Sequence, residues 1–287
     1  MLELNVLARD LHCATIAPMT RLSHVVTLVA TLAVAETAGA ARVRAADDPL
    51  SRARVLYNQG QFEAAVNAAE LARLLPGRAD SADLVAARAY LERYRVSAMS
   101  DDLTNARERL RRLDPQRLAA RERVEYIVGL GEALYLDQSF GAASAVFESV
   151  LQTGELLTTA ARDRVLDWWA DSVERDGRPR PEMDRRVVYQ RIRQRMEDEL
   201  AIHPSSSTAA YWLAAAARGE GDIQAAWDAA QAAWVRSPLA SDKGVALRED
   251  VDRLVLRAII PDRAKVSAQS PESIRAQWEQ FKERWKR

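Results

Sequence analysis

Three segments of this chain repeat one spacing of small and bulky apolar residues, and this repetition limits the possible fold more than any other feature. Residues 127–150 read IVGLGEALYLDQSFGAASAVFESV. Apolar or small side chains recur there every three or four residues on both sides of a short polar break, which is typical of two amphipathic helices joined by a turn. The same spacing recurs in residues 57–76 and 210–238. Such a chain is expected to form an array of helical hairpins that bury one another's apolar faces.

The composition agrees with an all-helical protein. Apolar residues make up 48% of the 287 residues, alanine supplies much of that share, and only 11 glycines and 10 prolines are present. Small side chains suit close helix–helix contact, and few glycines and prolines interrupt the helices. The 41 basic and 41 acidic residues cancel. Because no net field attracts the chain to phosphates and no nucleic-acid motif is present, we expect no nucleic-acid partner.

Cysteine and histidine are too scarce for most catalytic or metal sites. Cys13 is the single cysteine, and the histidines are His12, His24 and His203. This excludes a disulfide framework and a cysteine-rich zinc site, and it leaves a Ser/His/Asp triad at most one histidine if the N-terminus is removed. The sequence also lacks a glycine-rich phosphate loop. We therefore predict a non-enzyme without catalytic residues, metal or small-molecule cofactor.

The N-terminus has the pattern of an export signal. Arg21 forms a short positive region, residues 25–35 are an apolar run, and two small-x-small cleavage sites follow. The run is shorter than the roughly 20 residues of a comfortable membrane span. We predict a cleaved signal peptide within residues 19–45 and a periplasmic protein, with Met1 or Met19 as the true start. The alternative is a cytoplasmic protein with an uncleaved N-terminus.

Turn and capping residues divide the chain into three parts. We predict an N-terminal extension with the signal peptide (1–45), a helical repeat array (46–240) and a C-terminal helical capping region (241–287). Asp48 and Pro49 suit the start of the first helix, because an aspartate caps a helix and proline fits its first turn. The later expectations are a long helix over 182–202, a helix around 242–260, a loop beginning at Pro261 and a last helix opened by Ser270 and Pro271.

The residues of 127–150 and 210–238 resemble the tetratricopeptide repeat family in their small and large positions, and the resemblance covers roughly residues 48–238. It implies a right-handed α-superhelix (solenoid) of about five to six antiparallel helical hairpins. It also implies a concave face, formed by the first helix of each hairpin, that binds a peptide or a partner's helix. The residues expected on that face are Arg54, Tyr57, Asn58, Val128, Glu132, Tyr135, Leu136, Trp169, Tyr211 and Arg218.

Several other groups admit a structural and a functional interpretation. Trp227 and Trp234 lie on one helical face, where packing against the next helix is favoured over a ligand platform. Trp168 and Trp169 diverge by about 100° around a helix, so we expect one to pack and the other to reach the groove. His203 suits the end of the long helix. The arginines of residues 185–195 are expected to form a solvated, ion-paired face.

The last helix, over residues 271–287, has an apolar stripe surrounded by basic residues. We favour its packing on the end of the array over contact with a membrane or a partner. The sequence therefore predicts a non-catalytic scaffold or adaptor in the bacterial cell envelope with a protein or peptide partner. The alternative of another class is an envelope component that binds glycan or takes part in glycan hydrolysis. A pair of converging carboxylates with raised pKa would favour that alternative.

Overall fold

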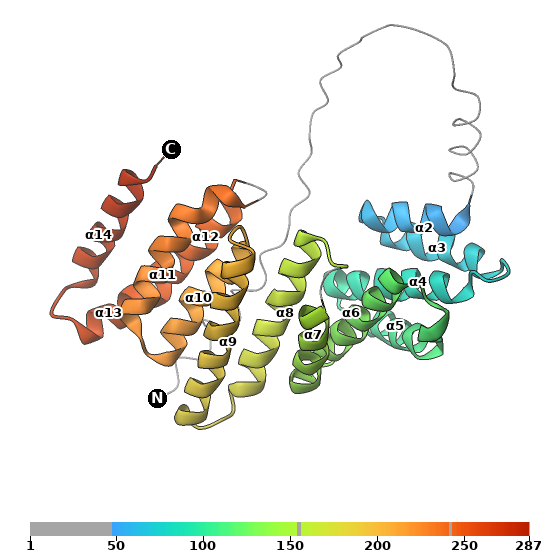
Figure 1. Ribbon diagram of the computed structural model, residues 1–287, viewed down its shortest axis with the longest axis horizontal. Coiled ribbons are helices and arrows are strands. Elements are labelled where there is room, and N and C mark those ends of the chain that lie inside the picture. Colours follow the sequence, from blue (N-terminus) through green and yellow to red (C-terminus); the bar gives the residue numbers. More distant parts are fainter. Residues whose placement is uncertain (1–47, 154–155, 241–242, 287) are drawn as a thin grey trace, which may run out of the picture. The chain divides into compact units, whose positions relative to one another are not determined.

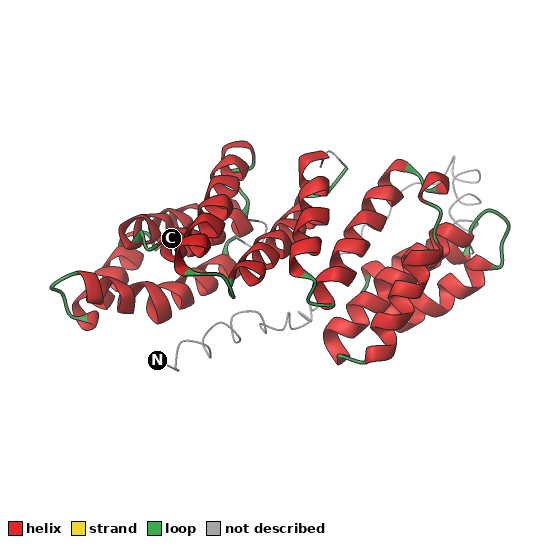
Figure 2. Ribbon diagram, turned by 90° about the horizontal axis from the view of Figure 1, so that it is seen from below, coloured by secondary structure: helices red, strands yellow, loops and turns green. Residues whose placement is uncertain are grey.

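The computed structural model describes residues 48–153, 156–240 and 243–286, and these residues form helices without any strand (Figure 2). The predicted signal peptide and Met19 lie outside the described residues. All the described helices belong to the unit Arg44–Arg287. The prediction of an all-α protein is confirmed for this part of the chain.

The helices form successive pairs in which each helix packs against the next one in the sequence (Figure 1). In chain order they are α2 (Pro49–Asn58), α3 (Phe62–Arg73), α4 (Ala79–Ser97), α5 (Ser100–Arg112), α6 (Ala120–Leu136), α7 (Phe140–Thr153), α8 (Thr159–Gly177), α9 (Glu182–Ile202), α10 (Ser207–Glu220), α11 (Ile223–Arg236), α12 (Val245–Leu254), α13 (Ile260–Val266) and α14 (Pro271–Arg284). Short 3-10 turns cover Pro115–Arg117 and Ser237–Leu239, and a π-helix covers Val255–Ile259.

Local sequence determines where several of these helices begin. The Asp48 carboxylate accepts a hydrogen bond from the Ser51 backbone N–H at 3.2 Å, and Pro49 follows in the first turn. Ser270 caps α14 in the same way through the Ser273 N–H. Each cap satisfies a backbone donor that the first helical turn leaves unpaired. The predicted starts at Asp48 and Ser270 are therefore confirmed.

The predicted loop at Pro261 is wrong. α12, the π-helix and α13 follow one another without a break, and Pro261 lies in the first turn of α13. Proline inside a helix removes one N–H donor and crowds the carbonyl four residues before it. The wider π turn immediately before Pro261 changes the local hydrogen-bond register, so the helical path continues past the proline.

The apolar core is divided along the chain. One set of buried residues joins α2, α3 and α4, a second joins α4, α5 and α6, and a third extends from α7 to α14. Within the third set, Phe147 of α7 occupies the space beside Gly131 of α6. A Cβ atom on Gly131 would lie 2.5 Å from the Phe147 ring. The absence of a side chain at position 131 thus leaves room for the Phe147 ring.

The chain end packs through aromatic rings. Trp278 of α14 is fully buried and meets Trp227 and Trp234 of α11 edge to face, with ring centroids 5.7 and 5.6 Å apart. Its indole N–H donates to the Asp252 carboxylate at 2.7 Å. The expected packing of Trp227 and Trp234 against a following helix is confirmed, and that helix is α14.

Candidate functional site

The first helices of the successive pairs form a continuous set of neighbours. α2 contacts α4, α4 contacts α6, α6 contacts α8, α8 contacts α10, and α10 contacts α12. We define the first-helix face by a set of residues on these helices. The residues of the described chain that define it are Arg54, Tyr57, Asn58, Arg88, Glu92, Arg95, Glu122, Glu125, Val128, Glu132, Tyr135, Leu136, Arg164, Tyr211 and Arg218.

The residues that the sequence singled out lie at very different depths. Arg54 and Asn58 are exposed on α2, whereas Glu132 of α6 is buried. The others on α2, α6 and α10 are half-buried, and they are Tyr57, Val128, Tyr135, Leu136, Tyr211 and Arg218. A partner can reach the exposed residues directly, although Arg54 also pairs with Glu122 of α6.

Trp169 lies inside the protein, so the expectation that one of the two neighbouring tryptophans reaches the groove is wrong. Trp169 is 1% exposed and Trp168 is 7% exposed. The Trp168 ring stacks on Phe147 at 5.7 Å, and the guanidinium groups of Arg191 and Arg195 lie over the Trp169 ring. Because α8 has α7 on one side and α9 and α10 on another, two side chains 100° apart can both be covered.

Tyr135 is tied to the next first helix. Its hydroxyl donates a hydrogen bond to the Asp171 carboxylate of α8 at 2.6 Å, and the Arg175 guanidinium lies 5.6 Å from its ring centre. Burial and the neighbouring Asp171 raise the pKa of Tyr135 above its usual range. Arg218 is likewise paired with Asp262 of α13 at 2.8 Å. These two residues therefore connect helices within the protein.

A charged cluster lies on the N-terminal part of the face, and we call it the Glu132 cluster. It contains Tyr57 of α2, Arg88, Glu92 and Arg95 of α4, Glu132 of α6 and Arg164 of α8. Glu92 accepts from Arg95 at 2.8 Å and from Arg164 at 3.1 Å. Arg88 lies 4.5 Å above the Tyr57 ring and pairs with Glu125 at 2.9 Å.

Glu132 is the unusual member of this cluster. It is 5% exposed, and its Oε1 atom has no hydrogen-bond partner among the described residues. Burial raises the pKa of Glu132 to about 7, and the negative charge of Glu92 contributes to the shift. Arg95, Arg88 and Arg164 act in the opposite direction without cancelling it. Burying an ionisable carboxyl group costs folding free energy, and groups with such raised pKa values concentrate at functional sites.

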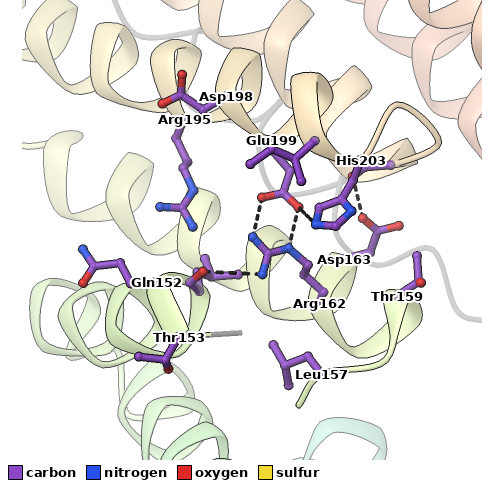
Figure 3. Close-up of a pocket in the computed structure, with 13 residues that line it drawn as sticks. Gln152, Thr153, Leu157, Thr159, Arg162, Asp163, Arg195, Asp198, Glu199 and His203 are labelled. Atoms are coloured by element: carbon purple, nitrogen blue, oxygen red, sulfur yellow. Dashed lines mark hydrogen bonds and ion pairs between the residues drawn. The ribbon is translucent and has the colours of Figure 1, made fainter. Parts of the chain in front are cut away.

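A cavity of about 580 Å³ lies elsewhere, between the ends of α7 and α9 and the starts of α8 and α10 (Figure 3). Arg162 is at its centre. The Arg162 guanidinium donates to both Glu199 oxygens, at 2.5 and 2.8 Å, and to the Leu151 carbonyl at 3.4 Å. The walls combine these polar groups with Leu151, Leu157 and Ile202.

Two further groups of the cavity bear on its chemistry. His203 follows α9 as expected, and its Nε2 atom lies 3.8 Å from Glu199. The Ser206 hydroxyl donates to Asp163, whose pKa burial raises. Sequence reasoning missed Arg162, Asp163 and Glu199, because Arg162 and Glu199 are separated by 37 residues and Asp163 and Ser206 by 43. No spacing pattern connects residues so far apart on different helices.

The arginine-rich helix α9 is ion-paired, as the sequence predicts. Arg186 pairs with Glu182 within the helix, while Arg191 and Arg195 both pair with Glu148 of α7. These pairs neutralise the basic run and join two hairpins.

The described residues contain no cluster of His, Cys, Asp or Glu suited to a metal ion, and none of their helices is long and apolar enough to cross a membrane. No protein-family description, curated protein or solved structure matches the chain.

Proposed function

We propose that this chain is a non-catalytic scaffold that binds a protein or peptide partner on the first-helix face. The observation that supports the proposal most directly is the unbroken series of contacts from α2 to α12, in which each first helix touches the next. A face built from one helix of every pair grows with the number of repeats, and this is how helical arrays provide extended binding surfaces.

The proposed arrangement is a tetratricopeptide-like right-handed solenoid of about five to six hairpins. The division of the core into successive sets supports it, because a globular helical domain would surround one common core. The pairs α2–α3, α4–α5, α6–α7, α8–α9 and α10–α11 provide five hairpins, and α14 packs on the last of them through Trp278. In this arrangement α14 covers an apolar end that would otherwise face water.

Arg54 and Asn58 are the best-placed contacts for a partner, because both are exposed on the first-helix face. Arginine is among the residue types that most often anchor interfaces. Tyr135 and Arg218 support the face through their bonds to Asp171 and Asp262. We therefore assign direct contact to the first two residues and a positioning role to the others.

One observation bears on the alternative that the protein binds or hydrolyses glycan. Three carboxylates line the cavity; Asp198 is exposed, and the two less exposed ones, Asp163 and Glu199, form its acid pair. Burial raises the pKa of Asp163. Glycoside hydrolysis needs one carboxyl group as an acid and another free to act as a nucleophile or base. Glu199 is 3% exposed and accepts hydrogen bonds from the Nε and Nη2 atoms of Arg162, so it is poorly placed for the second role. The cavity thus favours a structural role for its acid pair.

The proposed place of action is the bacterial envelope, following the signal-peptide pattern within residues 19–45. N-terminal sequencing of the protein from its native host tests this directly. A mature chain beginning between residues 39 and 48 supports export, and a chain that keeps Met1 refutes it.

Photo-crosslinking tests the binding face. A photoreactive amino acid at Asn58 on α2 samples the first-helix face, and one at the exposed Gln194 on the second helix α9 is the matched control. We expect a defined protein adduct from position 58 in envelope extract and none from position 194. Equal adducts from both positions, or recovery of glycan alone, would overturn the proposal.

A further inference from the structure

Two ion pairs of the first-helix face join first helices that are not consecutive. Arg164 of α8 reaches Glu92 of α4, 72 residues away, and Arg54 of α2 reaches Glu122 of α6. In each case one first helix lies between the partners in the contact series. Glu92 also accepts from Arg95 of its own helix, so one carboxylate holds two guanidinium groups. These ion pairs therefore connect the first helices, and a change in the charge of a neighbouring side chain can change which partners they join.

Glu132 lies on α6, the helix that the Arg164–Glu92 pair crosses. The groups that face it are Arg88, Glu92 and Arg95 from α4, Arg164 from α8 and Tyr57 from α2. Of the other helices packed against α6, α5 places Leu110 beside Gly129 and α7 places Phe147 beside Gly131. Charged groups that respond to Glu132 therefore come from α4 and α8, the helices that the ion pair joins.

The charge count differs between the two states of Glu132. When Glu132 is protonated, the three guanidinium groups of Arg88, Arg95 and Arg164 face the carboxylates of Glu92 and Glu125, and every arginine has a partner. When Glu132 is ionised, its buried carboxylate needs donors that the present geometry does not provide to Oε1. Arg88, Arg95 and Arg164 are the guanidinium groups that interact with Glu132. Arg88 pairs with Glu125, whereas Arg95 and Arg164 are both held by Glu92, which the new charge also repels.

We propose that the Arg164–Glu92 pair is a proton-controlled latch between α8 and α4, closed while Glu132 is protonated and released when Glu132 ionises. Ionised Glu132 draws Arg164 or Arg95 from Glu92, and the bond across α6 is lost. Release of the latch changes how the first-helix face binds a partner. This consequence for partner binding rests on the proposed function, whereas the latch itself does not. The pKa of Glu132, about 7, places the change near neutral pH.

The distance between α4 and α8 measures the latch without any partner. We would place nitroxide labels on cysteines at Val96 of α4 and Ala160 of α8, both exposed, in a Cys13→Ser background. Pulsed electron–electron double resonance then gives the distribution of distances between the two nitroxides at pH 5.5 and pH 8.5. With a midpoint near pH 7, the ionised fraction of Glu132 rises from about 3% to about 97%. We expect a longer or broader distribution at pH 8.5, with the midpoint at about 7.

Three variants decide between a latch and a general effect of pH. Glu132→Gln is nearly isosteric and should keep the short distance at both pH values. Arg164→Gln, at a side chain that is 52% exposed, should give the long distance at both. Glu122→Gln on the same helix removes the α2–α6 bond instead and should keep the response of the wild type.

An unchanged distance in the wild-type protein, or a pH response that survives in Glu132→Gln, overturns the proposal. Helical circular dichroism at both pH values confirms that each variant is folded. Because these measurements use the protein alone, their failure leaves the crosslinking result from Asn58 unaffected. Likewise, the absence of a partner adduct leaves the latch measurable.

Discussion

Removal of the Trp278 ring should separate α14 from the rest of the array. The ring is fully buried, meets Trp227 and Trp234 edge to face, and stacks on Phe281 with centroids 5.6 Å apart. α14 therefore depends on one inserted side chain for much of its contact with α11. Trp278→Ala empties that space while leaving the helix cap at Ser270 intact.

The expected cost is about 3–5 kcal/mol, the usual range for deleting a buried tryptophan. The Asp252 carboxylate keeps a partner after the substitution, because Lys282 also donates to it at 2.7 Å. The loss is thus one of packing and not of an orphaned charge. Trp278→Phe keeps a ring in the same place but loses the indole hydrogen bond and part of the buried ring volume, which should cost roughly 1–3 kcal/mol.

Urea unfolding followed by circular dichroism measures these costs. Trp285, the C-cap residue that follows α14, is 44% exposed, so Trp285→Ala is the matched control and should change stability by less than about 0.5 kcal/mol. Deletion of residues 271–287 should cause aggregation or a large loss of stability, since it uncovers the α11 tryptophans. Equal unfolding free energies for Trp278→Ala and Trp285→Ala would refute docking through Trp278.

Three further substitutions test the interior by the same urea unfolding assay. Gly131→Ala places a Cβ atom against a buried ring and should cost about 1–3 kcal/mol. Gly129→Ala should cost less, because the nearest neighbour of its Cβ atom is a leucine methyl group at 3.3 Å. Equal effects of the two substitutions would contradict the packing seen at Gly131. Arg162→Met leaves a buried carboxylate without its cation and should cost about 3–5 kcal/mol, against less than about 1 kcal/mol for Arg186→Met in an exposed pair. The native state keeps the Glu132 proton to a higher pH than the unfolded chain, so the free energy of unfolding should fall by on the order of 3 kcal/mol between pH 4.5 and about 7. Glu132→Gln should abolish that component, and an unchanged pH profile in this variant would show that Glu132 is not its source.

Local patterns predicted the helices well because their causes are local. The cap at Asp48, the start at Ser270 and the end of α9 at His203 each depend on residues within one turn. The exception at Pro261 has a tertiary cause. Val255, Ile259 and Ile260 are all buried against neighbouring helices, and this packing keeps the helical path continuous where the local rule predicts a break.

The candidate sites were predicted less well, because depth depends on how many neighbours surround a helix. Glu132 and Arg54 hold corresponding positions ahead of the turns that follow α6 and α2, and a sequence pattern treats them alike. Among the described helices, α6 packs against α4, α5, α7 and α8, whereas α2 packs against α3 and α4 and reaches α6 through the Arg54–Glu122 pair. The same place on a repeat is therefore buried in one case and exposed in the other.

By itself, the sequence determined the helical class, the helix starts and the aromatic residues that close the C-terminal end. These follow from periodicity and capping, which act over three or four residues. Only the tertiary structure decided that Arg164 pairs with Glu92, that Arg162 neutralises Glu199 and that Glu132 is buried. Charges 37 or 72 residues apart meet only after the helices have packed, and the protonation state of a carboxyl group depends on the solvent and charges that this packing leaves around it.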